Sequence, residues 1–99
     1  MSQNDFSYHK RACSLALKQV GFNLHSHEYK CDKDRWVSWL AESLLSGFHF
    51  LESGEIKIAL RCALQVREYL GRVGGFWPNP TLHDAYIELQ NQIENRIAG

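Results

Sequence analysis

Apolar side chains recur at three- and four-residue intervals along four stretches of the chain, and this spacing places them on one face of an α-helix. No stretch shows the sustained alternation of apolar and polar residues that a half-buried strand requires. The sequence therefore predicts an all-α fold, most simply a small four-helix bundle built around a tight central helical hairpin. The first expected helix begins near Asn4 or Asp5 and ends before Gly21, and the second begins at Asp32 or Asp34 and ends at Gly54. The third runs from about Glu55 to Val73, and the fourth begins near residues 79–81.

The apolar face of each expected helix identifies the residues that should form the core. The second helix is apolar over more than half of its circumference, so we expect it to have neighbours on several sides. The fourth has a narrow stripe that should pack against one neighbour. The predicted inward residues are, in the first helix, Phe6, Cys13, Ala16, Leu17 and Val20, and in the second helix, Trp36, Trp39, Leu40, Leu44, Gly47, Phe48, Phe50 and Leu51. In the third helix they are Ile56, Ala59, Ala63, Val66 and Leu70, and in the fourth helix Leu82, Tyr86, Leu89, Ile93 and Ile97.

Two connections interrupt the helical pattern. Residues 22–33 show neither helical nor strand periodicity and form the longest irregular connection, part of which could be a helical turn. The stretch GGFWPNP contains two glycines and two prolines, so the third helix cannot continue through it. Pro80 suits the first turn of the last helix, and Thr81 with Asp84 resembles a capping box in which Asp replaces the usual Glu or Gln.

Two glycines define the central hairpin. Gly54 lies at the end of the second helix, where glycine reaches a left-handed conformation without a Cβ clash, so we expect a tight turn there. Gly47 lies inside the helix, where glycine costs about 1 kcal/mol relative to alanine. We therefore expect the third helix to cross closely over Gly47 and to offer Ala59 and Ala63 at the contact.

Residues 40–73 resemble a single tetratricopeptide repeat. With Leu40 as the first position, Gly47, Phe50, Gly54 and Ala59 fall on the small, aromatic, turn and alanine positions of that family. The resemblance implies a helical hairpin and a module that binds proteins or peptides, because the family stacks such hairpins into grooves.

The same stretch departs from the family pattern at several positions. Ser43 stands where the family prefers tryptophan, Ser46 where it prefers leucine, and Val66 where it prefers alanine. No proline closes the unit near residue 71, and no second copy of the pattern occurs in the chain.

The chain of 99 residues is expected to form one helical domain over residues 1–99, because at this size one core uses most of the available apolar side chains. Eleven basic residues balance eleven acidic ones, so no excess charge attracts nucleic acid or an anionic membrane.

The sequence has no stretch near the roughly 18 apolar residues of a membrane span, and its start has no signal-peptide pattern. Cys13, Cys31 and Cys62 are an odd number without a disulfide-framework spacing, which favours a reducing compartment, and we expect a cytoplasmic protein.

The most site-like cluster in the sequence is His25, His27 and Cys31, because imidazole and thiolate are the usual zinc ligands. Their spacing matches no zinc pattern, and a fourth ligand would have to come from elsewhere in the fold. The alternative is a polar loop with the histidines in water and Cys31 packed as a small apolar residue. We expect no bound metal and no cofactor.

No pattern in the sequence favours catalysis. Cys13 and Cys62 lie within helical apolar patterning and are expected in the core, where a thiol is inert. Paired carboxylates occur only near helix ends and turns. We therefore expect no catalytic residue and no enzymatic activity.

Lys57, Arg61 and Arg72 share one face of the third helix and could bind phosphates. Glu68 interrupts this face, and the net charge of the chain is zero, so a solvated helix face also accounts for the pattern. Nucleic-acid binding by these three residues remains the alternative function, and a small metal-binding protein is a third.

Apolar residues outside the core stripes lead to the main functional hypothesis. Leu60 and Leu64 lie about 100° and 140° from the centre of the stripe of the third helix, and Leu45 and Ile87 also fall outside their stripes. Phe76 and Trp77 lie in a turn, where they either fold back to cap the bundle or are exposed as interface anchors. The hypothesis is a non-enzymatic protein–protein interaction module that binds another protein chain through Leu60, Leu64, Phe76 and Trp77. We expect a homodimer with Leu60 and Leu64 near or in the contact.

Overall fold

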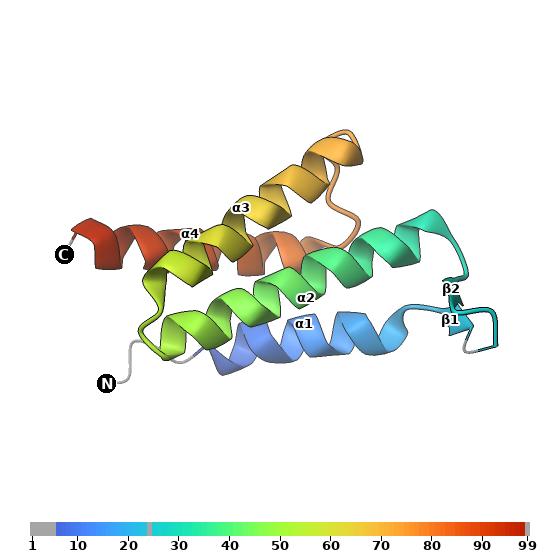
Figure 1. Ribbon diagram of the computed structural model, residues 1–99, viewed down its shortest axis with the longest axis horizontal. Coiled ribbons are helices and arrows are strands. Elements are labelled where there is room, and N and C mark those ends of the chain that lie inside the picture. The colour runs from blue at the N-terminus through green and yellow to red at the C-terminus, as the bar shows by residue number, and fades with distance from the viewer. Residues whose placement is uncertain (1–5, 24, 99) are drawn as a thin grey trace.

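Four helices make up most of the computed structural model (Figure 1), and the expectation of an all-α bundle is confirmed. The structure describes residues 6–23 and 25–98. The expected caps of the first helix, Asn4 and Asp5, lie outside the described residues. The helices are α1 (Ser7–Gln19), α2 (Asp32–Glu52), α3 (Ile56–Arg72) and α4 (Pro80–Ala98), and two short strands, β1 (Phe22–Asn23) and β2 (Glu28–Tyr29), lie between α1 and α2.

Helices α2 and α4 form the centre of the bundle. Helix α1 packs against both of them on one side and α3 packs against both on the other, with the α2–α3 pair as the most extensive contact (Figure 1). Helix α3 diverges from the bundle toward its C-terminal end, and the C-terminal end of α4 projects beyond its neighbours (Figure 1). No helix within the described part of the chain is long and apolar enough to cross a membrane.

The core draws on all four helices and confirms most of the predicted stripes. Leu40, Leu44, Phe48 and Leu51 of α2 are fully buried. Two of the predicted inward residues, Phe50 and Ile97, are exposed, so these expectations were wrong. Others are only half-buried: Leu17, Val20, Trp36, Trp39, Ile56 and Leu70. The buried apolar residues are Phe6, Cys13, Ala16, Val37, Leu40, Ala41, Leu44, Phe48, Leu51, Ala59, Ala63, Val66, Leu82, Ala85, Tyr86, Leu89 and Ile93.

The connection between α1 and α2 is an antiparallel hairpin and not an irregular segment, and its loop contains one turn of helical type, in which the backbone N–H of His27 donates a hydrogen bond of 2.8 Å to the carbonyl oxygen of Asn23. Its two-residue strands pair Phe22 with Tyr29 and Asn23 with Glu28. The hydroxyls of Tyr29 and Ser38 lie 3.0 Å apart, so this hydrogen bond holds the hairpin against α2. Strands of two residues are too short to produce a visible alternation of apolar and polar positions, which is why the sequence pattern missed them.

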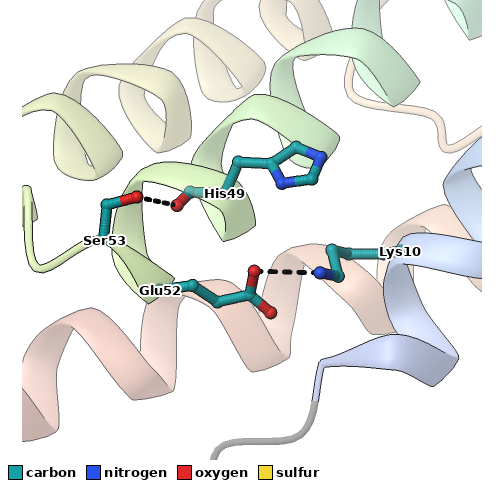
Figure 2. Close-up of polar contacts among 4 residues, drawn as sticks. All are labelled: Lys10, His49, Glu52 and Ser53. Atoms are coloured by element: carbon teal, nitrogen blue, oxygen red, sulfur yellow. Dashed lines mark hydrogen bonds and ion pairs between the residues drawn. The ribbon is translucent and has the colours of Figure 1, made fainter.

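The turn between α2 and α3 confirms the role expected for Gly54, which has a φ of 83°. At the end of α2, the hydroxyl of Ser53 donates a hydrogen bond of 3.1 Å to the carbonyl oxygen of His49 (Figure 2). At the preceding residue, Glu52 pairs with the Lys10 ammonium at 2.9 Å, which joins α1 to this end of α2 (Figure 2). The first contact closes the end of α2, and the second ties this end to α1.

Gly47 allows a close approach, but the nearest neighbour is not the one expected. A Cβ at this position would lie 2.7 Å from Cδ2 of Leu89 on α4 and 3.4 Å from Cβ of Cys62 on α3. The absence of a side chain therefore makes room mainly for α4, and α3 makes the looser contact. Ala59 and Ala63 are buried, as expected, but neither is the closest group to Gly47.

Asn79, and not Thr81, caps the start of α4. Its Oδ1 accepts hydrogen bonds from the backbone N–H of Thr81 at 2.9 Å and from the Thr81 hydroxyl at 2.7 Å. Asp84 instead lies 3.7 Å from Nδ1 of His83. The capping box expected for Thr81 and Asp84 is wrong, because asparagine one residue before Pro80 already satisfies the free amide.

Candidate functional site

The fully buried side chains of helix α3 are small, and two of its leucines are exposed. Ala59 and Val66 are fully buried, whereas Leu60 is 38% and Leu64 is 51% exposed. The prediction that these two leucines lie outside the core stripe is therefore confirmed. Among the described residues, neither the connection between α1 and α2 nor the turn after α3 covers these two leucines completely.

The two leucines border a shallow groove between α3 and α4. It has a volume of about 230 Å³. Ala63, Tyr86 and Ile93, which are buried, form its floor, and Gln90 lies at its side. Arg67 and Glu94, both exposed, place one positive and one negative group along its edges. The groove thus combines an apolar surface with charged edges, the composition of a typical protein interface.

The two aromatic residues of the α3–α4 turn have different environments. Phe76 is 78% exposed, as expected for an interface anchor. Trp77 is half-buried, with its ring centroid 5.5 Å from that of Tyr86 and 5.4 Å from that of His83. Trp77 therefore folds back onto the start of α4, so the structure does not bring it together with Leu60 and Leu64 in the α3–α4 groove.

Phe76 belongs to a second apolar hollow at the opposite end of the bundle from the α2–α3 turn. This pocket of about 370 Å³ is lined by Trp36, Val73, Phe76, Pro78 and Lys33. Sequence reasoning missed Trp36 as a surface residue because it assigned the whole wide apolar arc of α2 to the core. The width of that arc was the available signal, since one helix cannot bury more than half of its circumference without neighbours on every side.

A row of aromatic rings continues from this pocket along the α2–α3 contact. The rings of Trp36 and Trp39 meet edge to face with centroids 5.0 Å apart, and Trp39 lies 5.2 Å from Tyr69. The guanidinium of Arg72 lies 6.0 Å from the centre of the Tyr69 ring. A further hollow of about 360 Å³ beside this row contains Phe50 and Cys62.

The basic residues of α3 do not form one continuous patch. Lys57 and Arg61 are exposed on successive turns. Arg72 lies eleven residues beyond Arg61, about 16 Å along the helix axis. The exposed Glu68 lies between them, and the guanidinium of Arg72 is directed to Tyr69. The expected basic face is therefore divided into a pair of cations and a separate arginine.

His25, His27 and Cys31 are all exposed in the hairpin region. The expectation that Cys31 packs as an apolar residue was wrong, because it lies at the open position just before α2. Across residues 6–23 and 25–98, no three histidine, cysteine, aspartate or glutamate side chains are close enough to hold a metal ion.

The two helical cysteines differ in burial. Cys13 is fully buried, and desolvation raises the pKa of its thiol to about 12. Cys62 is half-buried at the edge of the α2–α3 hollow, and not in the core as expected, although burial also raises its pKa. A raised thiol pKa lowers the thiolate fraction at neutral pH, so neither environment activates a cysteine nucleophile.

Comparison with known proteins adds no relative from which a function could be transferred. No family model matches the chain, and neither a curated protein nor a solved structure matches it. The resemblance of residues 40–73 to one tetratricopeptide repeat therefore stays a prediction. The surface of α3 and α4 is therefore the basis on which a function can be proposed.

Proposed function

We propose that the protein is a non-enzymatic interaction module, an adaptor, small chaperone or regulator, that presents the outer face of α3 and the α3–α4 groove to another protein chain. One observation carries this proposal: two large apolar side chains on successive turns of α3, Leu60 and Leu64, are exposed beside a groove with an apolar floor.

Burial of these leucines by a partner is favourable. Full burial of one leucine contributes about 1.5–3 kcal/mol, so covering the exposed halves of two contributes on the order of 2 kcal/mol. Isolated exposed leucines are common on protein surfaces, but adjacent ones along a groove form a contiguous apolar patch. Phe76 extends the apolar surface at another point of the molecule and fits the same interaction function.

The partner chain that we expect is a second copy of the protein, in a homodimer with Leu60 and Leu64 at the contact. A twofold interface buries an apolar patch by pairing it with itself, so a single patch is sufficient. The chain carries no net charge to oppose this pairing.

Binding of nucleic acid through Lys57, Arg61 and Arg72 is the alternative. Lys57 and Arg61 are exposed and form no ion pair within the described part of the chain, which favours this reading for those two residues. A salt titration of binding to generic DNA separates the alternatives, because phosphate contacts weaken steeply with ionic strength and apolar contacts do not.

The proposed function is tested by affinity capture from the native host with the parent chain and with a Leu60→Glu/Leu64→Glu variant. We expect the parent to retain a defined partner chain and the double variant to lose it. Leu15→Glu is the matched control, because Leu15 is 55% exposed but lies on α1. A partner retained equally by all three chains would contradict the proposal for this surface.

A further inference from the structure

We propose that the partner on this surface is a second copy that pairs antiparallel along α3, with Leu60 of one copy against Leu64 of the other and Lys57 of one copy against Glu68 of the other. This inference rests on the proposed function and specifies the geometry of the contact. It follows from the order of four exposed side chains along one helix.

These four side chains share one face of α3. At 100° per residue, Lys57, Leu60, Leu64 and Glu68 lie within about 80° of one another, and all four are exposed. The face borders the α3–α4 groove, because Leu60 and Leu64 line it. Within the described part of the chain, Leu60 and Leu64 keep 38% and 51% of their surface exposed.

The spacing of these residues is self-complementary under a twofold axis. If the axis passes at residue 62, Leu60 of one copy lies opposite Leu64 of the other, each about 3 Å from the axis at 1.5 Å per residue. Lys57 and Glu68 then lie about 8 Å and about 9 Å from the axis on opposite sides, so Lys57 of one copy meets Glu68 of the other with an offset of one residue. Leu60 and Leu64 meet near the axis, where burial is most complete.

The charges select the antiparallel orientation. A parallel pairing would place Lys57 against Lys57 and Glu68 against Glu68 of the other copy, and like charges across an interface are unfavourable. The antiparallel pairing instead forms two equivalent ion pairs at the ends of the leucine contact.

In the isolated copy, Lys57 has no acidic residue three or four positions away, whereas Glu68 has Arg72 at that spacing. Neither Lys57 nor Glu68 takes part in an ion pair within the described residues. Arg61, one turn after Lys57, adds a second positive charge beside it, and like charges at this separation destabilise a helix. Glu68 of the second copy would approach both cations and relieve this repulsion.

The test is a charge exchange measured by sedimentation equilibrium at low salt on the full chain. We expect Lys57→Glu and Glu68→Lys each to weaken dimerisation about tenfold, since each change replaces two attractive pairs by two repulsive ones. The double variant Lys57→Glu/Glu68→Lys restores attraction at both ends without changing the net charge, so its dissociation constant should return to near that of the parent. Far-ultraviolet circular dichroism verifies that each variant remains helical.

Lys18→Glu is the control for net charge, because Lys18 is exposed on α1. It should leave dimerisation unchanged. One outcome would overturn the antiparallel register and leave the proposed function standing. In it, Leu60→Glu/Leu64→Glu dissociates the dimer, but Lys57→Glu/Glu68→Lys dimerises no more tightly than the two single charge variants. A parent chain that remains monomeric at all accessible concentrations overturns the second copy as partner, and capture of a different chain then decides the proposed function separately.

Discussion

Helices α2 and α3 form the most extensive contact of the bundle, yet they distribute their side chains in opposite ways. Helix α2 buries its large side chains, among them Leu44 and Phe48 at 0% exposure. Helix α3 buries Ala59, Ala63 and Val66 and leaves Leu60 and Leu64 exposed. The difference indicates that α2 supplies much of the core volume, whereas α3 packs through small residues and keeps apolar surface exposed at Leu60 and Leu64.

The C-terminal ends of α2 and α3 also differ in how they are held. The end of α2 is held by the Lys10–Glu52 ion pair and by Arg96, whose Nη1 donates a hydrogen bond of 2.9 Å to the carbonyl oxygen of Leu51. At the end of α3, the backbone N–H groups of Val73 and Gly75 bond to the Leu70 carbonyl within the same turn. Helix α2 is thus tied to α1 and α4 by side chains, and the end of α3 is closed by its own backbone.

The largest expected effect comes from Leu44→Ala, which tests whether α2 supplies the core. Leu44 is fully buried, so the truncation removes apolar contacts and leaves a cavity. We expect the free energy of unfolding to fall by about 2–5 kcal/mol in urea denaturation followed by tryptophan fluorescence. A loss below about 1 kcal/mol would show that the core around α2 is not close-packed.

Gly47→Leu tests the close approach of neighbouring helices to α2. The new side chain would overlap Leu89, so we expect destabilisation of at least about 1–3 kcal/mol from overpacking, seen as a lower melting temperature.

Gly71→Leu on α3 is the matched control for this change, because a Cβ there meets nothing within 4 Å. Leucine is also a better helix former than glycine, so the control should melt at or above the temperature of the parent. If both variants melt together, Gly47 does not mark a close contact.

The helices and their buried faces could be predicted from the sequence because each depends on local periodicity. The buried residues of α1 and α3 follow their stripes, and Leu60 and Leu64 were found from their angles alone. Ile97 was assigned wrongly because α4 extends past its neighbours, and periodicity carries no information on where a neighbouring helix ends (Figure 1).

The remaining part of the candidate surface depends on contacts between distant segments. Trp36 and Phe76 line one pocket although forty residues separate them, and a turn rich in glycine and proline does not fix the direction of its aromatic side chains. Phe76 and Trp77 accordingly diverge, the first into solvent and the second onto Tyr86. Sequence patterns identify such residues as candidates, but only the packed structure places them.

Arg96→Met sharpens the comparison of the helix ends. It removes the hydrogen bond to Leu51 and keeps most of the side-chain volume, so we expect a loss of about 1 kcal/mol in the free energy of unfolding. Arg61→Met, at an exposed position of α3, should change that free energy by less than about 0.5 kcal/mol. Equal losses in urea denaturation would remove the distinction between the two helices.

The smallest expected effect is that of Leu64→Ala, the same chemical change as Leu44→Ala made on the exposed face of α3. Leu64 is 51% exposed, so truncation removes little buried area and leaves no cavity. At submicromolar protein, where an isolated chain is measured, the free energy of unfolding should stay within about 0.5 kcal/mol of the parent.

The effect of Leu64→Ala on the free energy of unfolding should depend on protein concentration. Self-association stabilises the folded chain by mass action, so the parent should gain stability with concentration, whereas Leu64→Ala should gain less because its contact is smaller. Denaturation of both chains across a range of concentrations measures the difference. If Leu64→Ala costs as much as Leu44→Ala at every concentration, Leu64 belongs to the core and the contrast between α2 and α3 is lost. If its cost is small at low concentration and grows as the chains associate, the exposed leucines of α3 belong to an interface.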